Sequence, residues 1–169
     1  EFYKEFRADA ESGKYQTLVL DTMTEVENVC QQAVLEDLKE EAEGKGRSKE
    51  KLATNEYLAR NLRMKALFDT ARNTGVNLVV LNYLKEKWVR AAGEKTATNT
   101  GELILDGWNR TEAQADINID MTTKQKTGKT IMVATIKSNR FDRDFNIRSY
   151  EDTDYDELYT LLVAPWLEG

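Results

Sequence analysis

The chain has 169 residues, of which 40% are apolar and 32% are charged, a composition typical of one globular domain with a packed core. It has no histidine and a single cysteine, which excludes an internal disulfide framework, Ser-His or Cys-His nucleophilic catalysis, and the usual zinc and haem ligands. The net charge of −6 argues against nucleic-acid binding by the whole surface, and no run of about 18 apolar residues occurs that would span a membrane.

The first apolar segment, residues 16 to 21, ends on an aspartate and predicts a buried parallel strand. Thr24 and Glu27 follow with the spacing of a capping box, which predicts the start of a helix that reaches about Glu43. Residues 44 to 48 contain glycine and charged residues, and we interpret them as a surface loop that ends this helix.

Residues 55 to 73 predict a second helix, because apolar side chains repeat at i, i+3, i+4 and i+7 and Gly75 stands where a helix stop is expected. Residues 76 to 82 then predict a second apolar strand. The order strand, helices, strand is typical of a parallel sheet with helical crossovers, so we expect an α/β fold. The predicted apolar face of the second helix consists of Met64, Leu67, Phe68 and Ala71.

The pattern changes in the second half of the chain. Residues 85 to 101 hold few apolar side chains and predict a long mobile loop. Residues 115 to 121 and 130 to 136 predict the two strands of a β-hairpin. Residues 149 to 169 carry six acids and no base and predict an acidic C-terminal helix. We interpret residues 1 to 169 as a single domain.

Polar side chains stand at the ends of both apolar strands. Asp21 ends the first strand, with Thr22 after it, and Asn82 ends the second. The carboxyl ends of parallel strands meet at one edge of a sheet, where α/β proteins bind ligands. An aspartate at such an edge holds Mg²⁺ in nucleotide sites, usually through water, and Glu25 is placed to orient a water for attack on a phosphate. The alternative is that Asp21 caps the next helix, Glu25 interacts with the helix dipole, and Asn82 is a turn residue.

Basic residues gather around the second strand of the predicted hairpin. Residues 121 to 148 carry seven bases against two acids. Lys137 and Arg140, three residues apart at the rim of the sheet, are candidates for phosphate contacts within one subunit or across an interface. A solvated basic strand end is the alternative. The Gly-Lys-Thr triplet at residues 128 to 130 is not a phosphate-binding loop, because Thr123 stands where the first glycine is required and a strand is expected after the triplet.

Four segments follow one another along the chain: Thr17-Leu18-Val19-Leu20-Asp21-Thr22 with Thr24-Glu25, residues 55 to 73 with 77 to 82, Ala115-Asp116-Ile117-Asn118-Ile119, and Ile136-Lys137-Ser138-Asn139-Arg140. In this order they resemble the phage RecA-like nucleotide-binding proteins, the group that includes single-strand-annealing ATPases. The first segment resembles the Walker B strand of that family, and the second resembles the unit that ends at its phosphate-sensing strand. The third resembles its Ala-Asp strand, and the fourth its lysine-to-arginine strand end. The resemblance covers residues 15 to 148.

The resemblance implies part of a RecA-like P-loop NTPase core, with a mainly parallel sheet, helical crossovers and a C-terminal β-hairpin. It implies ATP and Mg²⁺ as ligands, and phage DNA recombination or single-strand annealing as the process. It also implies a homo-oligomer in the cytoplasm of a phage-infected or prophage-bearing bacterium. The implied roles are metal binding by Asp21, catalysis by Glu25 and Asn82, and nucleotide binding by Asp21, Thr22, Lys137 and Arg140.

One part of the family pattern is missing from the sequence. In that family a glycine-rich Walker A loop precedes the Walker B strand, and no such loop occurs here. We expect the chain to be either the C-terminal part of an ATPase, with residues 1 to 14 as the remnant of an upstream helix or loop, or a shortened relative that has lost nucleotide binding. In either case the chain alone should bind ATP poorly and be inactive, because the lysine and the amide cradle of the loop are absent.

The resemblance also implies a role for residues 85 to 101, since RecA-like proteins tend to contact single-stranded DNA through mobile loops. Here Lys85, Lys87 and Arg90 surround Trp88, whose indole could stack on a base. The alternative is that Trp88 packs back onto the sheet, and the sequence slightly favours that position.

Two other functions stay open from the sequence. One is a non-catalytic DNA-binding or assembly module with a degenerate P-loop fold. The other, a nuclease with an acidic metal cluster, is the weaker hypothesis, because the spacing of the available aspartates does not force them together. These aspartates are Asp21, Asp106, Asp116 and Asp120.

Overall fold

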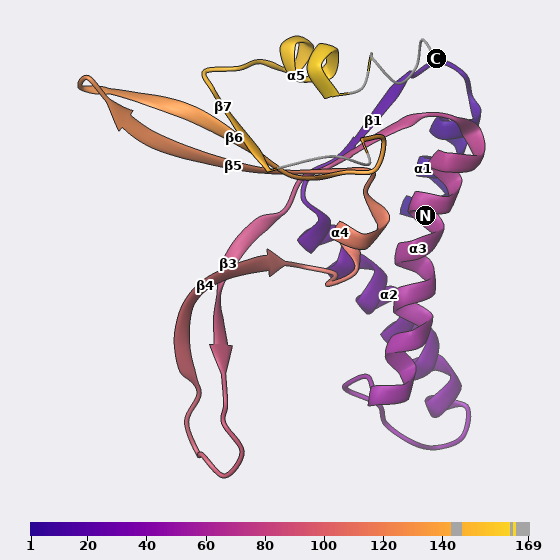
Figure 1. Ribbon diagram of the computed structural model, residues 1–169. Helices are drawn as coiled ribbons and strands as arrows, with labels where there is room; N and C mark the ends of the chain where they lie inside the picture. The colour runs from indigo at the N-terminus through magenta and orange to yellow at the C-terminus, as the bar shows by residue number, and fades with distance from the viewer. Residues whose placement is uncertain (143–146, 163, 165–169) are drawn as a thin grey trace. The chain divides into compact units, whose positions relative to one another are not determined.

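The computed structural model describes residues 1 to 142, 147 to 162 and 164 (Figure 1). The chain divides into two compact units, residues 1 to 111 and 112 to 169, and each is described by itself. The first unit contains α1 (Phe2–Glu11), β1 (Thr17–Leu20), α2 (Met23–Glu43), the 3₁₀ turn η1 (Thr54–Glu56), α3 (Tyr57–Thr74), β2 (Asn77–Val80), β3 (Tyr83–Val89) and β4 (Thr98–Asp106). The short helix α4 (Thr111–Gln114) crosses the boundary. The second unit contains β5 (Ile117–Lys126), β6 (Lys129–Asn139), β7 (Arg148–Glu151) and α5 (Tyr155–Leu162).

The first unit is built around two apolar clusters between its helices and the β1–β2 pair. The predicted apolar face of α3 is confirmed, since all four of its side chains are buried. Trp108 is also buried, packs its ring against Phe68 with the ring centroids 6.0 Å apart, and donates from its indole nitrogen to Asn61 (3.1 Å). The predicted stop of α3 is confirmed too, because Gly75 takes the left-handed conformation (φ +72°) that ends helices.

The predicted capping box at the start of α2 is wrong. The N-cap residue is Thr22, and its side chain makes no capping hydrogen bond. The Thr24 hydroxyl donates instead to the backbone carbonyl of Asp106, at the end of β4. Glu27 pairs with Arg60 of α3 (2.6 Å), so this carboxylate ties two helices together rather than capping its own.

The expected RecA-like core is also wrong. Only β1 and β2 run parallel among the described residues, in a two-stranded sheet that pairs Thr17 with Asn77 and Leu20 with Val80. The other sheets, β3–β4 and β5–β6–β7, are antiparallel. The cause lies in the connections, because a parallel pair needs a crossover of a dozen or more residues. After β2 no connection contains a helix of that length among the described residues, and the later strands pair antiparallel.

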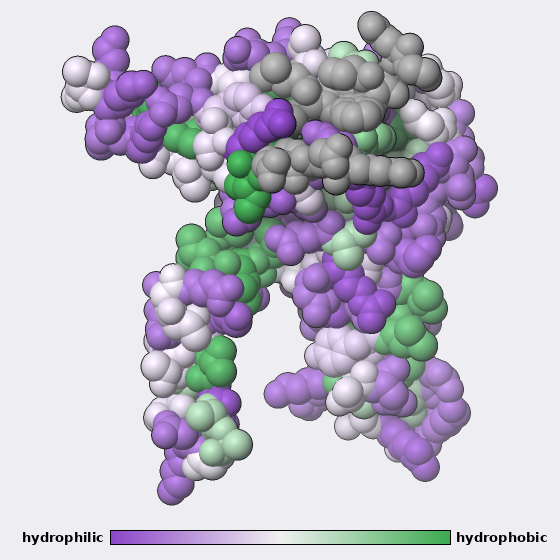
Figure 2. Space-filling model, in the orientation of Figure 1, coloured by the Kyte–Doolittle hydropathy of each residue, from purple (hydrophilic) through white to green (hydrophobic). Residues whose placement is uncertain are grey.

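Residues 85 to 101 lie in the β3–β4 hairpin rather than in an irregular loop. The strands pair from Tyr83 with Asp106 to Val89 with Thr98, with a register shift between Glu86 and Trp88. The sequence did not predict these strands, because many of their side chains are polar or charged and none is fully buried. Figure 2 shows green apolar atoms on this hairpin, which carries exposed aliphatic side chains between the charged ones.

The predicted hairpin of the second unit is confirmed as β5–β6. Its two-residue turn, Thr127 (φ +50°) and Gly128 (φ +77°), has positive φ at both positions, as hairpin turns of this length prefer. The triplet at residues 128 to 130 therefore belongs to a turn and a strand, which agrees with its rejection as a phosphate-binding loop. The predicted C-terminal helix is present as α5, and residues 165 to 169 lie outside the described residues.

Glu151 links β7 to β5 through two ion pairs. Its carboxylate accepts hydrogen bonds from Lys124 and from Lys126 (2.7 Å to the latter). The hydrogen bonds from these two lysines lower the pKa of Glu151 from 4.5 to about 2, and the bond from Lys124 has the larger effect.

This pKa shift predicts a pH-dependent attachment of β7. Because the folded-state pKa lies below the unfolded value of 4.5, the stabilisation is complete above pH 4.5 and is lost as the pH falls toward 2. Hydrogen exchange of the β7 amides, followed from pH 5 to pH 2, should therefore lose protection in this window. Glu151→Gln should flatten that dependence, and an unchanged profile in this variant would contradict the assignment.

Candidate functional site

The parallel strands β1 and β2 end side by side. The Leu81 amide donates to the Leu20 carbonyl (3.0 Å), and the Met23 amide donates to the Leu81 carbonyl (2.8 Å). These bonds hold the segment after β1 against the segment after β2. The structure therefore brings Asp21, after β1, beside Asn82, after β2, as the parallel-strand argument predicts.

Two buried side-chain oxygens at these strand ends have no hydrogen-bond partner among the described residues. They are the hydroxyl of Thr22 and the carboxamide oxygen of Asn82. Thr22 as a residue is 6% exposed. An unpartnered buried polar group costs about 1–3 kcal/mol, and native proteins keep few of them without a reason. Both oxygens lie on the edge where the sequence predicts a ligand.

The N-terminus of α2 adds hydrogen-bond donors to this edge. Thr22 is the N-cap, and its carbonyl accepts from the Val26 amide (3.1 Å). The amides of Thr24 and Glu25 lie in the first turn, where helix geometry offers no acceptor within the helix. The partial positive charge at the N-terminus of this 21-residue helix favours an anion at that position.

A third segment, Asp106-Gly107, closes one side of the site and was missed by the sequence reasoning. The Asp106 carbonyl accepts the hydroxyl of Thr24. Gly107 has φ +143°, and a Cβ built there would lie 3.3 Å from the Asn82 carboxamide oxygen and 3.4 Å from the Thr24 amide nitrogen. The available signal was a glycine directly after a strand that ends on an acid.

Gly107→Ala is expected to lower the free energy of unfolding by about 1–3 kcal/mol, because it adds both backbone strain and a crowded methyl group. Urea unfolding measures this loss. Gly13→Ala is the matched control, since Gly13 also has positive φ (+66°) but nothing within 4 Å of its added Cβ. Equal losses in the two variants would show that contact with Asn82 and Thr24 contributes nothing.

The two predicted acids, Asp21 and Glu25, are exposed at the same edge. Over the ranges that the structure describes, no three His, Cys, Asp or Glu side chains gather into a group that could hold a metal ion. The Asp21 carboxylate and the Thr22 hydroxyl are oxygen donors of the kind Mg²⁺ prefers, and this ion usually binds one or two carboxylates and keeps several waters. The chemistry of these two donors is compatible with a hydrated Mg²⁺ held through water.

No family model, curated protein or solved structure matches the chain. The function is therefore argued from the site itself. Two cavities, of about 290 and about 300 Å³, lie between α1 and the neighbouring helices, and none of the strand-end residues lines either. In the described part of the chain, no helix is long and apolar enough to cross a membrane.

Lys137 and Arg140 belong to the second unit and form ion pairs within it. The Lys137 ammonium pairs with Asp120 (3.2 Å). The Arg140 guanidinium pairs with Asp116 (3.2 Å) and donates to the carbonyl of Ala113. Both residues therefore belong to a different unit from the strand ends of β1 and β2.

The predicted DNA-binding residues lie on β3 and just after it. Lys85 pairs with Asp106 (2.9 Å), and Lys87 pairs with Glu102 (2.7 Å). Trp88 is 59% exposed, so the packed position that the sequence favours is wrong. Arg90, which follows β3, is exposed as well. The hairpin therefore presents an accessible indole beside cations that are partly neutralised.

Proposed function

We propose that the strand-end site binds the phosphate groups of Mg·ATP, and that the chain acts in an ATPase of phage DNA recombination or single-strand annealing. The observation that carries the proposal is the pair of buried, unpartnered oxygens of Thr22 and Asn82 beside the first-turn amides of Thr24 and Glu25 in α2. The amides suit phosphate oxygens, and the hydroxyl and carboxamide oxygens suit waters held by a metal or poised for attack.

Each residue of the site then has a distinct task. Asp21 and Thr22 would hold Mg²⁺ through water, and Asn82 would accept a hydrogen bond from a water beside the terminal phosphate. Glu25 would orient the attacking water. Bound Mg²⁺ supplies charge neutralisation for the transferring phosphate. The sequence contains no GxxxxGK[ST] loop, so the affinity of this chain for ATP should be low.

Titration of the chain with a fluorescent ATP analogue, with Mg²⁺ and with EDTA, tests this proposal. We expect weak binding that requires Mg²⁺ and that Asp21→Asn removes. Asp9→Asn is the matched control, because Asp9 is another exposed aspartate of the same unit, on α1. Mg²⁺-independent binding, or equal binding by the two variants, would contradict the proposal.

A homo-oligomer belongs to the same proposal. Lys137 and Arg140 would reach the nucleotide of a neighbouring subunit only after leaving Asp120 and Asp116. Sedimentation velocity with and without Mg·ATP should then show assembly that Lys137→Ala and Arg140→Ala weaken. A monomer under both conditions would contradict this part.

The exposure of Trp88 favours a second candidate function, binding of single-stranded DNA by the β3–β4 hairpin. An exposed indole beside Lys85, Lys87 and Arg90 offers a stacking surface with cations for the backbone. This function needs no nucleotide, and it is the activity expected of a non-catalytic DNA-binding module.

A further inference from the structure

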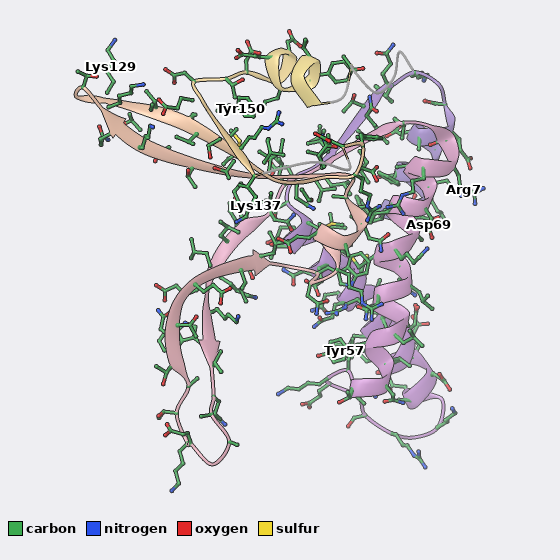
Figure 3. All side chains as sticks on the ribbon, in the orientation of Figure 1. Arg7, Tyr57, Asp69, Lys129, Lys137 and Tyr150 are labelled. Carbon is green, nitrogen blue, oxygen red and sulfur yellow. The ribbon has the colours of Figure 1, made fainter. Side chains whose placement is uncertain are left out.

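The outer part of the β5–β6 hairpin is a two-stranded ribbon. The third strand, β7, pairs with β6 only at residues 133 to 136. The four outermost β5–β6 pairs, from Thr123 with Met132 to Lys126 with Lys129, therefore have no further strand beside them among the described residues. Figure 3 shows Lys129 at the tip of this ribbon.

Three lysines point to one face of the ribbon. Lys126 and Lys129 are directly opposite each other in the register, and residues that pair directly share a face. Lys124 lies two residues before Lys126 and so shares that face as well. Like charges opposite one another destabilise a hairpin, so an anion bound at this face would offset the repulsion between the lysines.

Two carboxylates, Glu151 and Asp152, only partly neutralise this lysine face. Glu151 of β7 accepts hydrogen bonds from Lys124 and Lys126. Lys129 has no hydrogen-bond or ion-pair partner among the residues described. Asp152, which follows β7, also raises the pKa of Lys126, so the five groups keep a charge of about +1. Asp116 and Asp120 are paired at the other end of the hairpin.

We propose that this lysine face (Lys124, Lys126 and Lys129) binds the phosphate backbone of double-stranded DNA. A two-stranded β-ribbon fits the major groove, which places a tip of this kind between two phosphate strands. Lys124 and Lys126 are about 6.7 Å apart along the strand, so their ammonium groups can contact different phosphates. The binding is electrostatic and carries no sequence preference.

The test is the salt dependence of duplex binding, measured by fluorescence anisotropy with a labelled duplex and the full chain. Lys126→Gln/Lys129→Gln should weaken binding at low salt by tenfold or more. It should also reduce the slope of log K against log[salt] by about 1.8, since each phosphate contact contributes about 0.9. Lys14→Gln/Lys51→Gln, which removes two exposed lysines of the first unit, is the matched control and should change neither quantity.

Glu151→Gln gives a second, opposite readout, because it removes the carboxylate that occupies two of the lysines. Duplex affinity and the salt slope should both rise. Circular dichroism and thermal unfolding check that each variant keeps its fold; loss of opposed lysines should not unfold the tip.

Four outcomes would overturn the proposal. The first is wild-type duplex binding by the double variant, and the second is unchanged binding by Glu151→Gln. The third is an affinity for heparin equal to that for the duplex, which would show that the face binds any polyanion. The fourth is binding of single strands alone, lost in Trp88→Ala and kept in the lysine variant, which would assign the activity to the β3–β4 hairpin. None of these depends on ATP, so failure here and failure of the nucleotide proposal are distinguishable.

Discussion

Thr22→Val is expected to stabilise the chain and to abolish nucleotide binding in the same variant. The hydroxyl is buried and unpartnered, so replacing it with a methyl group of similar size removes an unsatisfied polar atom without leaving a cavity. The free energy of unfolding should rise by about 1–3 kcal/mol. If the hydroxyl serves Mg·ATP, the same change removes a ligand group. Urea unfolding and Mg·ATP titration of one sample measure both effects.

Thr111→Val is the matched control for this prediction. Thr111 is equally buried, at 4% exposed, but its hydroxyl donates to the Trp108 carbonyl (2.7 Å). Its loss should therefore destabilise the chain, by about 1 kcal/mol. A Thr22→Val variant that loses stability like Thr111→Val, or that binds Mg·ATP as the wild type does, would contradict the account of the site.

Trp88→Ala is expected to weaken single-stranded DNA binding by about 1–3 kcal/mol and to leave the fold intact. The indole is 59% exposed, so its removal costs little packing, whereas a stacked base would lose its partner. Anisotropy with a labelled oligonucleotide gives the affinity, and the unfolding midpoint gives the stability.

Trp108→Ala provides the contrast, because Trp108 is 2% exposed and packs against Phe68. Removing this buried ring should lower the free energy of unfolding by about 3–5 kcal/mol. Wild-type DNA affinity in Trp88→Ala would show that the hairpin does not bind DNA through this indole. A large loss of stability in that variant would show instead that Trp88 belongs to a packed core.

The parts of the fold that the sequence predicted correctly are those set by local patterns. The apolar spacing along α3 and the glycine at its end are decided within one helix, and both were confirmed. The β5–β6 hairpin follows from alternation and a two-residue turn with glycine at its second position. Such signals need no knowledge of distant contacts.

The errors concern contacts between residues far apart in sequence. Sheet direction depends on which strands pair, and the short connections after β2 exclude the parallel sheet that was expected. Thr24 bonds to Asp106 across 82 residues rather than capping its own helix. Gly107 reaches the site through the same long-range contact, which the local pattern of a glycine after a strand-ending acid does not specify.

The candidate site was predicted in part. The positions of Asp21 and Asn82 at neighbouring strand ends follow from strand polarity alone. The burial of Thr22 and the missing partners of its hydroxyl and of Asn82 do not, since they depend on how α2, β2 and the end of β4 meet.

The most direct test of the central claim is a titration of the ¹⁵N-labelled chain with Mg·ATP at millimolar concentrations, followed in amide correlation spectra. We predict shifts confined to the strand-end site, at the amides of Thr24, Glu25 and Gly107 and at the Asn82 side chain, that vanish when EDTA removes Mg²⁺. Unchanged resonances at these four positions, or shifts only elsewhere in the chain, would show that the edge of β1 and β2 is not a nucleotide site.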